Sequence, residues 1–423
     1  MKGIADQWLR DILRTLYQQR TATRSIIIDA TALNAGSVSQ ALGVLLRSGT
    51  ILKVGELESN GGRRREVLTL NQDAAYFIGV DLESHRIRFA LASFGGDVRY
   101  RWEEDLEPSA SLDVHKLFDG IERVAGILDP QPRGRLLAVG ISYPGLMDQE
   151  GRLTAVNLGW RQFRLAAELE EVRKARGFAG LPIFLEPDRH SCVRAEQWLG
   201  RAQNRRNGAY VSCDRGIGIG IFLDGKAVEG WRDMAGELGH LTIDPDAEDI
   251  CICGKRGCLE AIATSANIVR QYLEKTGKRD GPTIRIRFVD ILERARKNEE
   301  AAVAVLRRAG RAWGLALSHV VNLLNPEIII LGGDLITGED VLVPLIKEEL
   351  FRHSVPELVD GLEIATSSLG LDIRLRAAAS LAFRKCLDDP ALLKRMCSPV
   401  LTPHRPSAAA QKVAMTTGRR ERK

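Results

Sequence analysis

The most informative stretch of this 423-residue chain is residues 239–258, which read GHLTIDPDAEDICICGKRGC. It contains His240 and, within eight residues, Cys251, Cys253 and Cys258. Two cysteines one residue apart are too close for a relaxed disulfide, whereas three thiolates and one imidazole complete a tetrahedral zinc shell. Since four protein ligands leave no open position, we predict a structural Zn²⁺ rather than a catalytic one. Reduced cysteines in a loop are the alternative.

Carboxylates flank this stretch on both sides. Glu237 precedes His240, and Glu260 follows Cys258. A metal would therefore hold two segments together, each of which carries a carboxylate. Carboxylate oxygens accept hydrogen bonds from vicinal hydroxyl groups, so this pairing is typical of a site for a polyol. Solvated surface glutamates are the alternative.

From Tyr76 onward, apolar segments of strand length alternate with segments of helical periodicity. We expect strands at 76–80, 86–94, 137–142, 183–185, 209–213, 217–223 and 327–331. We expect helices at 113–128, 301–324 and 371–386. This alternation predicts an α/β body that is long enough for two lobes with a ligand cleft between them.

Residues 1–72 predict a winged helix-turn-helix domain. The expected elements are helices at 6–19, at 25–30 and after the N-cap Asn34, then a hairpin of 51–54 and 67–70. A small structural helical lobe is the alternative.

The third of these helices carries candidate contacts to double-stranded DNA. Its apolar residues recur at helical spacing and face inward, which leaves Ser37, Ser39 and Gln40 on the other face. Serine and glutamine near the start of such a helix suit phosphates and base edges. In the hairpin, Gly61-Gly62 allows a close approach to DNA, and arginines there can enter a narrow minor groove. The predicted contacts are Asn34, Ser37, Ser39, Gln40, Arg63, Arg64 and Arg65.

The net charge of +5 lies at the ends of the chain. Residues 405–423 carry six basic residues and one acidic residue, 6 − 1 = +5. Residues 1–70 carry ten basic and six acidic residues, +4, so the middle is −4 and only the ends favour a polyanion. Residues 398–423 also lack hydrophobic periodicity, and we expect a disordered basic tail there.

Charged residues interrupt the first part of the chain at Lys2, Asp6, Arg10 and Asp11, which is not the pattern of a signal peptide. No apolar run approaches the roughly 18 residues of a spanning helix. The spacing of the cysteines indicates metal ligation in a reducing compartment rather than a disulfide framework. We therefore expect a cytoplasmic protein with no membrane contact.

Taken together, these motifs resemble the ROK family of repressors, open reading frames and sugar kinases, and more closely its winged-helix repressor branch. The resemblance covers residues 6–385 and rests above all on Ala235–His240 and the Cys251–Glu260 block. Other matching segments are Thr23-Arg24-Ser25, Gly61-Gly62-Arg63-Arg64, Tyr143-Pro144-Gly145, Asn157-Leu158-Gly159-Trp160, Gly216–Gly220 and Asn325-Pro326-Glu327. The resemblance adds Arg24 to the DNA-contacting residues.

The resemblance also implies a two-lobed actin-like, ribonuclease-H-like ATPase fold of the ROK sugar-kinase type. The first lobe would comprise residues 74–186 and 370–390, and the second lobe, with the zinc loop, residues 187–369. Its implied sugar-binding residues are Gly145, Asp188, Glu237, His240 and Glu260.

The phosphate-binding motifs of ROK kinases are altered in this chain. The family's Asp-x-Gly-Gly-Thr turn, which cradles ATP phosphates, becomes Asp81-Leu82-Glu83-Ser84-His85, and Gly-Thr of the second phosphate loop becomes Asp214-Arg215. A carboxylate at about 4 Å from a phosphate costs roughly 1–4 kcal/mol per charge pair at a surface-like dielectric. We therefore do not expect ATP as a cofactor.

The family's catalytic Asn-Asp pair becomes Pro187-Asp188. The resemblance implies that Asp188 is the base that takes a proton from a sugar hydroxyl in kinase members, and we expect this role to be vestigial here. Pro187 lacks the amide that binds a neighbouring hydroxyl, a loss on the order of 1–3 kcal/mol when the partner stays buried.

The predicted function is a transcriptional regulator, most simply a repressor, of carbohydrate genes. It would bind operator DNA as a homodimer or tetramer and respond to a sugar or sugar phosphate. One alternative is an ATP-dependent kinase of glucose or N-acetylhexosamines with an appended DNA-binding domain. Another is a regulator with a vestigial cleft, whose signal is a protein partner.

Overall fold

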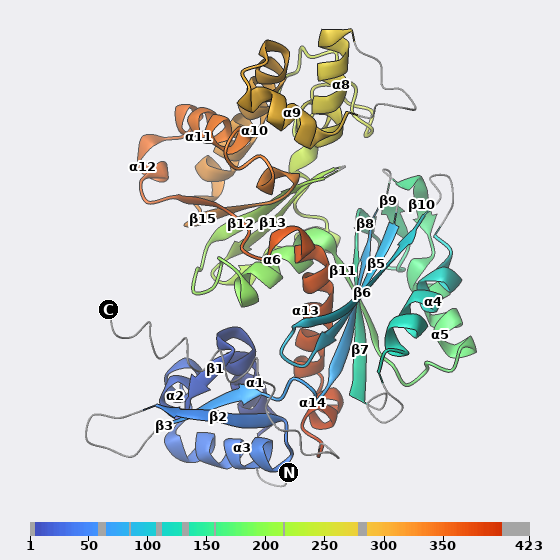
Figure 1. Ribbon diagram of the computed structural model, residues 1–423, viewed down its shortest axis with the longest axis vertical. Helices are drawn as coiled ribbons and strands as arrows, with labels where there is room; N and C mark the ends of the chain where they lie inside the picture. The colour runs from blue at the N-terminus through green and yellow to red at the C-terminus, as the bar shows by residue number, and fades with distance from the viewer. Residues whose placement is uncertain are drawn as a thin grey trace.

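The computed structural model describes residues 5–57, 65–83, 86–106, 112–128, 135–155, 158–214, 216–277 and 286–399. Figure 1 shows a small N-terminal head (blue) next to a body of two larger α/β lobes. Across these described ranges, no helix is both long and apolar enough to cross a membrane.

The head, residues 5–71, combines helices with a small antiparallel sheet in the order β1-β3-β2. Its elements are α1 (Asp6–Gln19), β1 (Thr21–Thr23), α2 (Arg24–Thr31), α3 (Ala35–Arg47), β2 (Ile51–Leu57) and β3 (Arg65–Leu70). The predicted N-cap is confirmed, because Asn34 Oδ1 accepts the Ser37 N–H at 2.9 Å. The sequence did not predict β1, since three residues show no periodicity.

The first lobe contains a mixed sheet in the order β11-β7-β4-β5-β6. Its strands are β4 (Tyr76–Leu82), β5 (Arg86–Ser93), β6 (Val98–Asp105), β7 (Leu136–Tyr143) and β11 (Ile183–Pro187). Helices α4 (Val114–Ala125) and α5 (Leu165–Ala175) cover one face, and α13 (Ile373–Asp388) covers the other (Figure 1).

Helix α13 lies unusually close to β4 and β7 because two glycines face it. A Cβ at Gly79 would lie 2.6 Å from the Ala379 nitrogen, and a Cβ at Gly140 would lie 2.0 Å from the Ala378 oxygen. Such distances are well below van der Waals contact, so neither position accepts a side chain without moving the helix. The glycines therefore fix the place of α13 on the sheet.

The second lobe contains a sheet in the order β14-β13-β12-β15-β16. Its strands are β12 (Gly208–Cys213), β13 (Ile217–Leu223), β14 (Lys226–Ala227), β15 (Ile328–Gly333) and β16 (Glu363–Thr366). Helices α10 (Glu300–Leu324) and α11 (Leu342–His353) pack together in this lobe, and α6 (Asp188–Leu199) packs on β12 and β13. Since α6 also packs on α13, these two helices lie between the sheets (Figure 1).

The smaller elements complete the two lobes. They are β8 (Leu146–Met147), β9 (Leu153–Ala155) and β10 (Trp160–Phe163), the helices α7 (Leu259–Ala263), α8 (Ser265–Thr276), α9 (Phe288–Arg296), α12 (Pro356–Val359) and α14 (Pro390–Met396), and the 3₁₀ turns η3 (Trp231–Asp233), η4 (Leu238–His240), η5 (Asp334–Ile336) and η6 (Gly370–Asp372).

Every strand and helix that the sequence predicted in the body is present, with ends displaced by a few residues. The prediction missed the short strands β8, β9, β10 and β14, and it also missed β6 and β16 of the two main sheets. Strand β6 is rich in charged residues and alternates between half-buried and exposed positions at the edge of its sheet, and β16 has four residues. Neither strand carries the apolar run that marks the interior strands.

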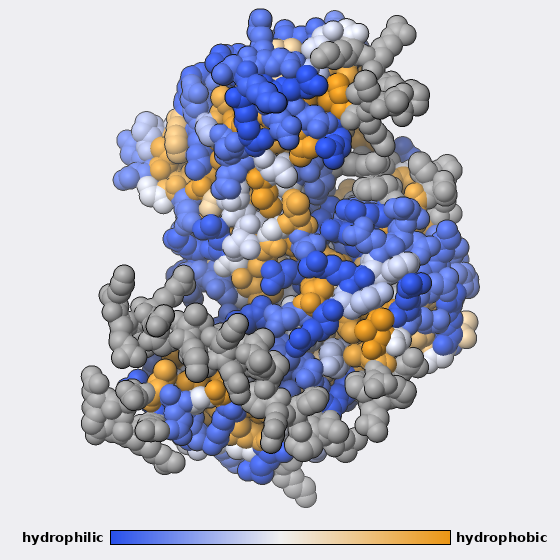
Figure 2. Space-filling model, viewed as in Figure 1, coloured by the Kyte–Doolittle hydropathy of each residue, from blue (hydrophilic) through white to orange (hydrophobic). Residues whose placement is uncertain are grey.

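The head and the body share one hydrophobic core. Tyr17 of α1 stacks on Phe383 of α13 with ring centroids 4.0 Å apart, and Trp198 of α6 meets Tyr17 edge-on. Figure 2 shows mostly hydrophilic residues on one face of the molecule, with hydrophobic residues in small patches. Contacts of this kind make the head a packed part of the structure rather than a tethered one.

Candidate functional site

A cleft of about 840 Å³ lies between the two lobes. It is lined by all five residues that the sequence assigned to sugar binding: Gly145, Asp188, Glu237, His240 and Glu260. A cavity of this size, with apolar walls and convergent polar groups, suits a small-molecule ligand.

At one end of the cleft, which we call the acceptor end, Glu237, His240 and Glu260 come together. Glu260 lies in the first turn of α7, is 7% exposed, and accepts the Ile217 N–H at 3.0 Å. Burial raises the pKa of this carboxyl group, while the Ile217 N–H opposes the shift. Glu237 is half exposed to the cleft. Both side chains therefore keep acceptor oxygens for a hydroxylated ligand.

Arg189 holds the loops of the acceptor end in place. Its guanidinium donates to the carbonyl oxygens of Ala235 at 2.7 Å, Asp233 at 2.8 Å and Gly145 at 3.1 Å. It thereby joins a loop of the first lobe to the loop that carries Glu237. Gly145 (φ +86°) adopts a backbone conformation that favours glycine.

Next to the acceptor end, the side chains of His240, Cys251, Cys253 and Cys258 form a compact cluster. Their potential ligand atoms all lie within 4.8 Å of one another. Cys253 Sγ and Cys258 Sγ are 3.8 Å apart, and Cys251 Sγ and His240 Nδ1 are 3.4 Å apart. A tetrahedral shell with metal–sulfur bonds of about 2.3 Å separates sulfurs by about 3.8 Å, so the four residues fit a metal ion.

This geometry separates the two roles that the sequence gave to His240. Its Nδ1 faces the cysteines, whereas its Nε2 lies 3.8 Å from Glu237 Oε2. A metal bound through Nδ1 would therefore orient the ring so that its other nitrogen supports a cleft carboxylate.

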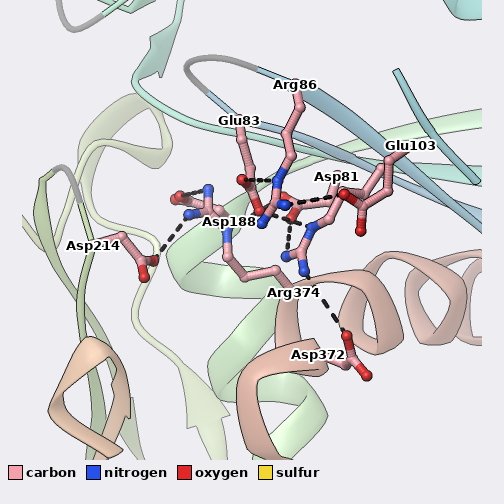
Figure 3. Close-up of polar contacts among 9 residues, drawn as sticks. Asp81, Glu83, Arg86, Glu103, Asp188, Asp214, Asp372 and Arg374 are labelled. Carbon is pink, nitrogen blue, oxygen red and sulfur yellow. Dashed lines mark hydrogen bonds and ion pairs between the residues drawn. The ribbon is translucent and has the colours of Figure 1, made fainter. Parts of the chain in front are cut away.

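The same cleft is also lined by a cluster of arginines and carboxylates, which we call the paired end (Figure 3). Arg374 at the start of α13 reaches Asp188 Oδ2 at 2.7 Å, Asp214 Oδ2 at 3.2 Å and Asp81 Oδ1 at 3.2 Å. The three aspartates belong to different segments of both lobes. Burial alone would lower the pKa of Arg374, but the aspartates raise it, so the guanidinium stays charged.

Glu83 is part of the same cluster, and this corrects the argument made from the sequence. Arg88 Nε lies 2.7 Å from Glu83 Oε1, and Arg86 Nε donates to Glu83 Oε2 at 2.8 Å. Burial alone would raise the pKa of Glu83, but Arg88, Arg86 and Arg374 lower it. Glu83 is therefore an ionised, paired carboxylate, and simple repulsion of phosphate overstates its effect. The arginine side chains themselves occupy this end of the cleft.

Asp214 differs from its neighbours. Burial raises its pKa to about 6 in spite of Arg374, and Asp334, Glu83 and Asp81 add to the shift. The adjacent Arg215 lies outside the described residues.

Asp188 begins α6 directly after Pro187 ends β11. Its Oδ1 accepts the Arg189 N–H at 2.7 Å and its Oδ2 accepts from Arg374. A general base needs an oxygen within reach of the substrate proton, and here both oxygens already accept hydrogen bonds. Beneath it, buried Glu186 binds Arg384, Arg194 and Ser191; burial alone would raise its pKa, but these partners lower it to about 2.

The head presents most of the described DNA-contact candidates on its surface. Ser39 and Gln40 of α3 and Arg65 of β3 are exposed. Arg24 donates to Ser39 Oγ at 3.1 Å. The expectation for Ser37 is wrong: it is 8% exposed, because it lies one helical turn before buried Ala41 on the inner face. Gly61-Gly62, Arg63 and Arg64 lie outside the described residues.

The sequence reasoning missed the arginines that organise the cleft: Arg86, Arg88, Arg189 and Arg374. The signal was the presence of three aspartates at or just after the ends of predicted strands: Asp81 in β4, Asp188 after β11 and Asp214 after β12. Carboxylates that come together in a fold require a cation, and Arg374 and Arg376 are the cations at the start of the predicted helix that continues with small and apolar residues.

The fold and the cleft define a two-lobed α/β protein of the sugar-kinase type. Residues 77–385 match the ROK family, and the chain belongs to that family. The resemblance inferred from the sequence is thereby confirmed.

Named relatives include both regulators and kinases. The xylose repressor of Bacillus spizizenii is 28% identical over 381 residues, 89% of this chain and 95% of the relative. The glucokinase of Halalkalibacterium halodurans is 28% identical over 310 residues, 70% of this chain and 92% of the relative. A solved ROK transcriptional regulator, a homologue of the Escherichia coli MLC protein, superimposes with a TM-score of 0.72 at 27% identity and covers 93% of this chain and 99% of its own.

Proposed function

We propose that this protein is a DNA-binding transcriptional regulator of carbohydrate genes, which binds a sugar or sugar derivative at the acceptor end of the cleft. Residues 1–72 would be a winged helix-turn-helix that reads operator DNA in the cytoplasm. The lobes formed by 74–186 with 370–390, and by 187–369, would bind the effector. Relatives that include the head are regulators, which supports this assignment.

One observation carries the proposal: α13 connects the cleft to the head. Near its N-terminus Arg374 contacts carboxylates of both lobes, and near its C-terminus Phe383 stacks on Tyr17 of α1. A ligand that changes lobe closure would act on Arg374 and therefore on the helix under the head. Coupling requires such a shared element with two arrangements.

We further propose that phosphoryl transfer is lost. Arg374 and Arg88 fill the paired end of the cleft, and Asp188 is engaged by Arg374. Releasing Asp188 for a sugar hydroxyl would leave the buried guanidinium with fewer partners, which is costly.

For the Cys–His cluster we propose Zn²⁺ in a structural role. Three thiolates and one imidazole are the donors that zinc prefers, and they leave no position for a substrate. When bound, the ion would supply a fixed crosslink, while Glu237 and Glu260 remain the groups that contact the ligand.

For the head we propose that Gln40 and Ser39 contact base edges and that Arg24, Asn34 and Arg65 contact the backbone. Arg63 and Arg64 stay candidates from the sequence. A homodimer, or a tetramer built from two dimers, would place two heads on two half-sites.

The test is a mobility-shift and footprinting experiment with duplex DNA from upstream of the gene itself, with and without sugars. We expect a footprint that a sugar alters, and loss of that footprint in Gln40→Ala with unchanged folding. No specific complex under any ligand condition contradicts the proposal.

A sugar kinase is the second candidate, favoured by the glucokinase relatives and by the presence of Asp188. A coupled assay with hexoses and N-acetylhexosamines decides it: turnover that Asp188→Asn abolishes would overturn the assignment. Thermal-shift screening tests the third candidate, a regulator with a vestigial cleft that responds to a protein partner. A sugar that raises the Tm binds the native state, and such a result would contradict this candidate.

A further inference from the structure

The four side chains of the Cys–His cluster differ in their access to solvent. Cys251 and Cys258 are 3% and 0% exposed, whereas Cys253 is exposed. Cys253 also lines the cleft between the lobes. Small molecules can therefore reach one thiol of the cluster, and a purely structural role makes no use of this access.

A second thiol lies close to Cys253. Cys253 Sγ is 3.8 Å from Cys258 Sγ, and four residues separate the two cysteines along the chain. Since the sulfurs of a disulfide are about 2.05 Å apart, they would have to approach each other by roughly 1.8 Å. The turn at Gly254 has room for this shift, because a Cβ there would have no described atom of a distant residue within 4 Å.

Cys251 is the poorer partner for Cys253. Only Ile252 separates these two cysteines, and this spacing is too short for a relaxed disulfide. Cys251 Sγ instead lies 3.4 Å from His240 Nδ1. The geometry therefore pairs the exposed thiol of Cys253 with the buried thiol of Cys258.

The cysteines outside the cluster have a different environment. All four are buried, and burial raises the pKa of each of these thiols. A buried thiol that stays protonated is a weak nucleophile, since the thiolate is the reactive form. An oxidant would therefore discriminate between the cluster and the other cysteines, which are Cys192, Cys213, Cys386 and Cys397.

We propose that Cys253 is an oxidation site for hydroperoxides and that Cys258 resolves the oxidised form as a disulfide, which releases the metal. This inference goes beyond the proposed function, although it rests on the metal that the proposed function assigns to the cluster. Oxidation would open the loops that carry Glu237 and Glu260 and thereby abolish the response to a sugar.

The chemistry takes two steps. The Cys253 thiolate first attacks one peroxide oxygen, so that a sulfur–oxygen bond forms, the oxygen–oxygen bond breaks and hydroxide leaves. The Cys258 thiolate then attacks the Cys253 sulfur, so that the disulfide forms and a second hydroxide leaves. The two thiolates together lose two electrons, the peroxide gains them, and both hydroxide ions take up protons to become water.

The disulfide would dismantle the ligand set. A disulfide sulfur is no thiolate ligand, so only His240 and Cys251 would remain to hold a metal. His240 Nε2 lies 3.8 Å from Glu237 Oε2, so loss of the metal at Nδ1 would also free the ring that supports this carboxylate.

The experiment treats the full chain, loaded with Zn²⁺, with hydrogen peroxide. A chromogenic chelator measures released metal, and mass spectrometry after differential alkylation identifies each oxidised cysteine. We expect release of about one Zn²⁺ per chain together with a Cys253–Cys258 disulfide, while the four buried cysteines stay reduced. Dithiothreitol with added Zn²⁺ should restore the metal and the slow hydrogen exchange of residues 237–260.

Two variants accompany the measurement. Cys253→Asp replaces the exposed thiol by a carboxylate, which zinc also accepts, and peroxide should release its metal at least about tenfold more slowly. Cys386→Ala removes a buried cysteine outside the cluster and should release metal at the rate of the wild type. If Cys253→Asp fails to fold or to bind metal, mapping of the oxidised cysteines in the wild type still decides the matter.

The outcomes separate this inference from the proposed function. Metal that stays bound in peroxide, a disulfide that excludes Cys253 or Cys258, or earlier oxidation of a buried cysteine overturns the inference and leaves the structural metal and the regulator intact. A purified chain whose cluster holds no metal before oxidation contradicts the proposed metal and, with it, this inference.

Discussion

Both ends of the cleft contain carboxylates, but only at the paired end are these carboxylates in close ion pairs with arginines. At the paired end, Asp81 and Glu83 bind Arg88, and Asp188 binds Arg374. At the acceptor end, Glu260 faces the Ile217 N–H and His240. Half-exposed Glu237 has Arg189 Nη1 at 3.9 Å and His240 Nε2 at 3.8 Å, both beyond hydrogen-bond distance. Carboxylates that already have cations stabilise the fold, whereas carboxylates with spare acceptor oxygens can bind a ligand. This difference supports the proposal that the ligand binds at the acceptor end.

Disruption of the Cys–His cluster should produce the largest effect, because it would unfold the loops of the acceptor end while the paired end stays intact. Structural zinc contributes roughly 10–16 kcal/mol of apparent binding free energy in small zinc domains. In Cys258→Ser we expect loss of bound metal, rapid hydrogen exchange over residues 237–260, and loss of sugar binding. Exchange in α13 should stay slow.

Metal content by elemental analysis and hydrogen exchange by mass spectrometry measure this outcome. Glu248→Gln changes an exposed residue of the same loop and should behave like the wild type. A Cys258→Ser protein that keeps its loop protection and binds sugar normally would contradict the structural role.

Removal of Arg374 should have the next largest effect, this time at the paired end. Arg374→Met leaves Asp81, which is fully buried, and Asp188 without one of their cations. Breaking a buried pair from one side costs about 3–5 kcal/mol, which denaturant unfolding will measure. Arg374→Lys should recover little, since a point charge cannot reach three carboxylates.

The matched control is Arg101→Met, which removes an exposed ion pair of 2.8 Å to Asp372. That change should cost less than about 1 kcal/mol. Equal stability of Arg374→Met and Arg101→Met would mean that the paired end is not a stabilising cluster.

Most of the body could be predicted from the sequence, because its interior strands are long apolar runs and the Cys-x-Cys block has a specific spacing. The paired end could not. Arg374 follows Asp188 by 186 positions along the chain, and only folding brings them to 2.7 Å. The prediction that Ser37 faces outward was wrong for a local reason. The buried face of α3 is wider than its leucines and valine indicated, and it includes small residues such as Ala41.

A smaller effect is expected from Glu260→Gln, which tests the acceptor end without disturbing the metal. The amide oxygen can still accept the Ile217 N–H, but the charge is lost. Hydrogen bonds to a charged group contribute about 1.5–3 kcal/mol, so sugar affinity should fall roughly tenfold to a hundredfold. Calorimetric titration with the sugar found by thermal-shift screening measures this change. Unaltered affinity, as expected for the control Glu274→Gln outside the cleft, would remove Glu260 from the ligand site.

The smallest expected effect is a pH dependence of stability caused by Asp214, the aspartate of the paired end whose pKa is raised. Its pKa is about 6 in the folded protein, above the ordinary value of 3.8. Between these values the native state holds a proton that the unfolded chain has released, so stability falls as the pH rises through this window. Asp214→Asn should flatten the slope there, because no proton is then exchanged. Denaturant unfolding across the window measures it, with the exposed Asp224→Asn as the control. An identical slope in wild type and Asp214→Asn would show that Asp214 does not titrate in this window, because Arg374 compensates fully for its burial.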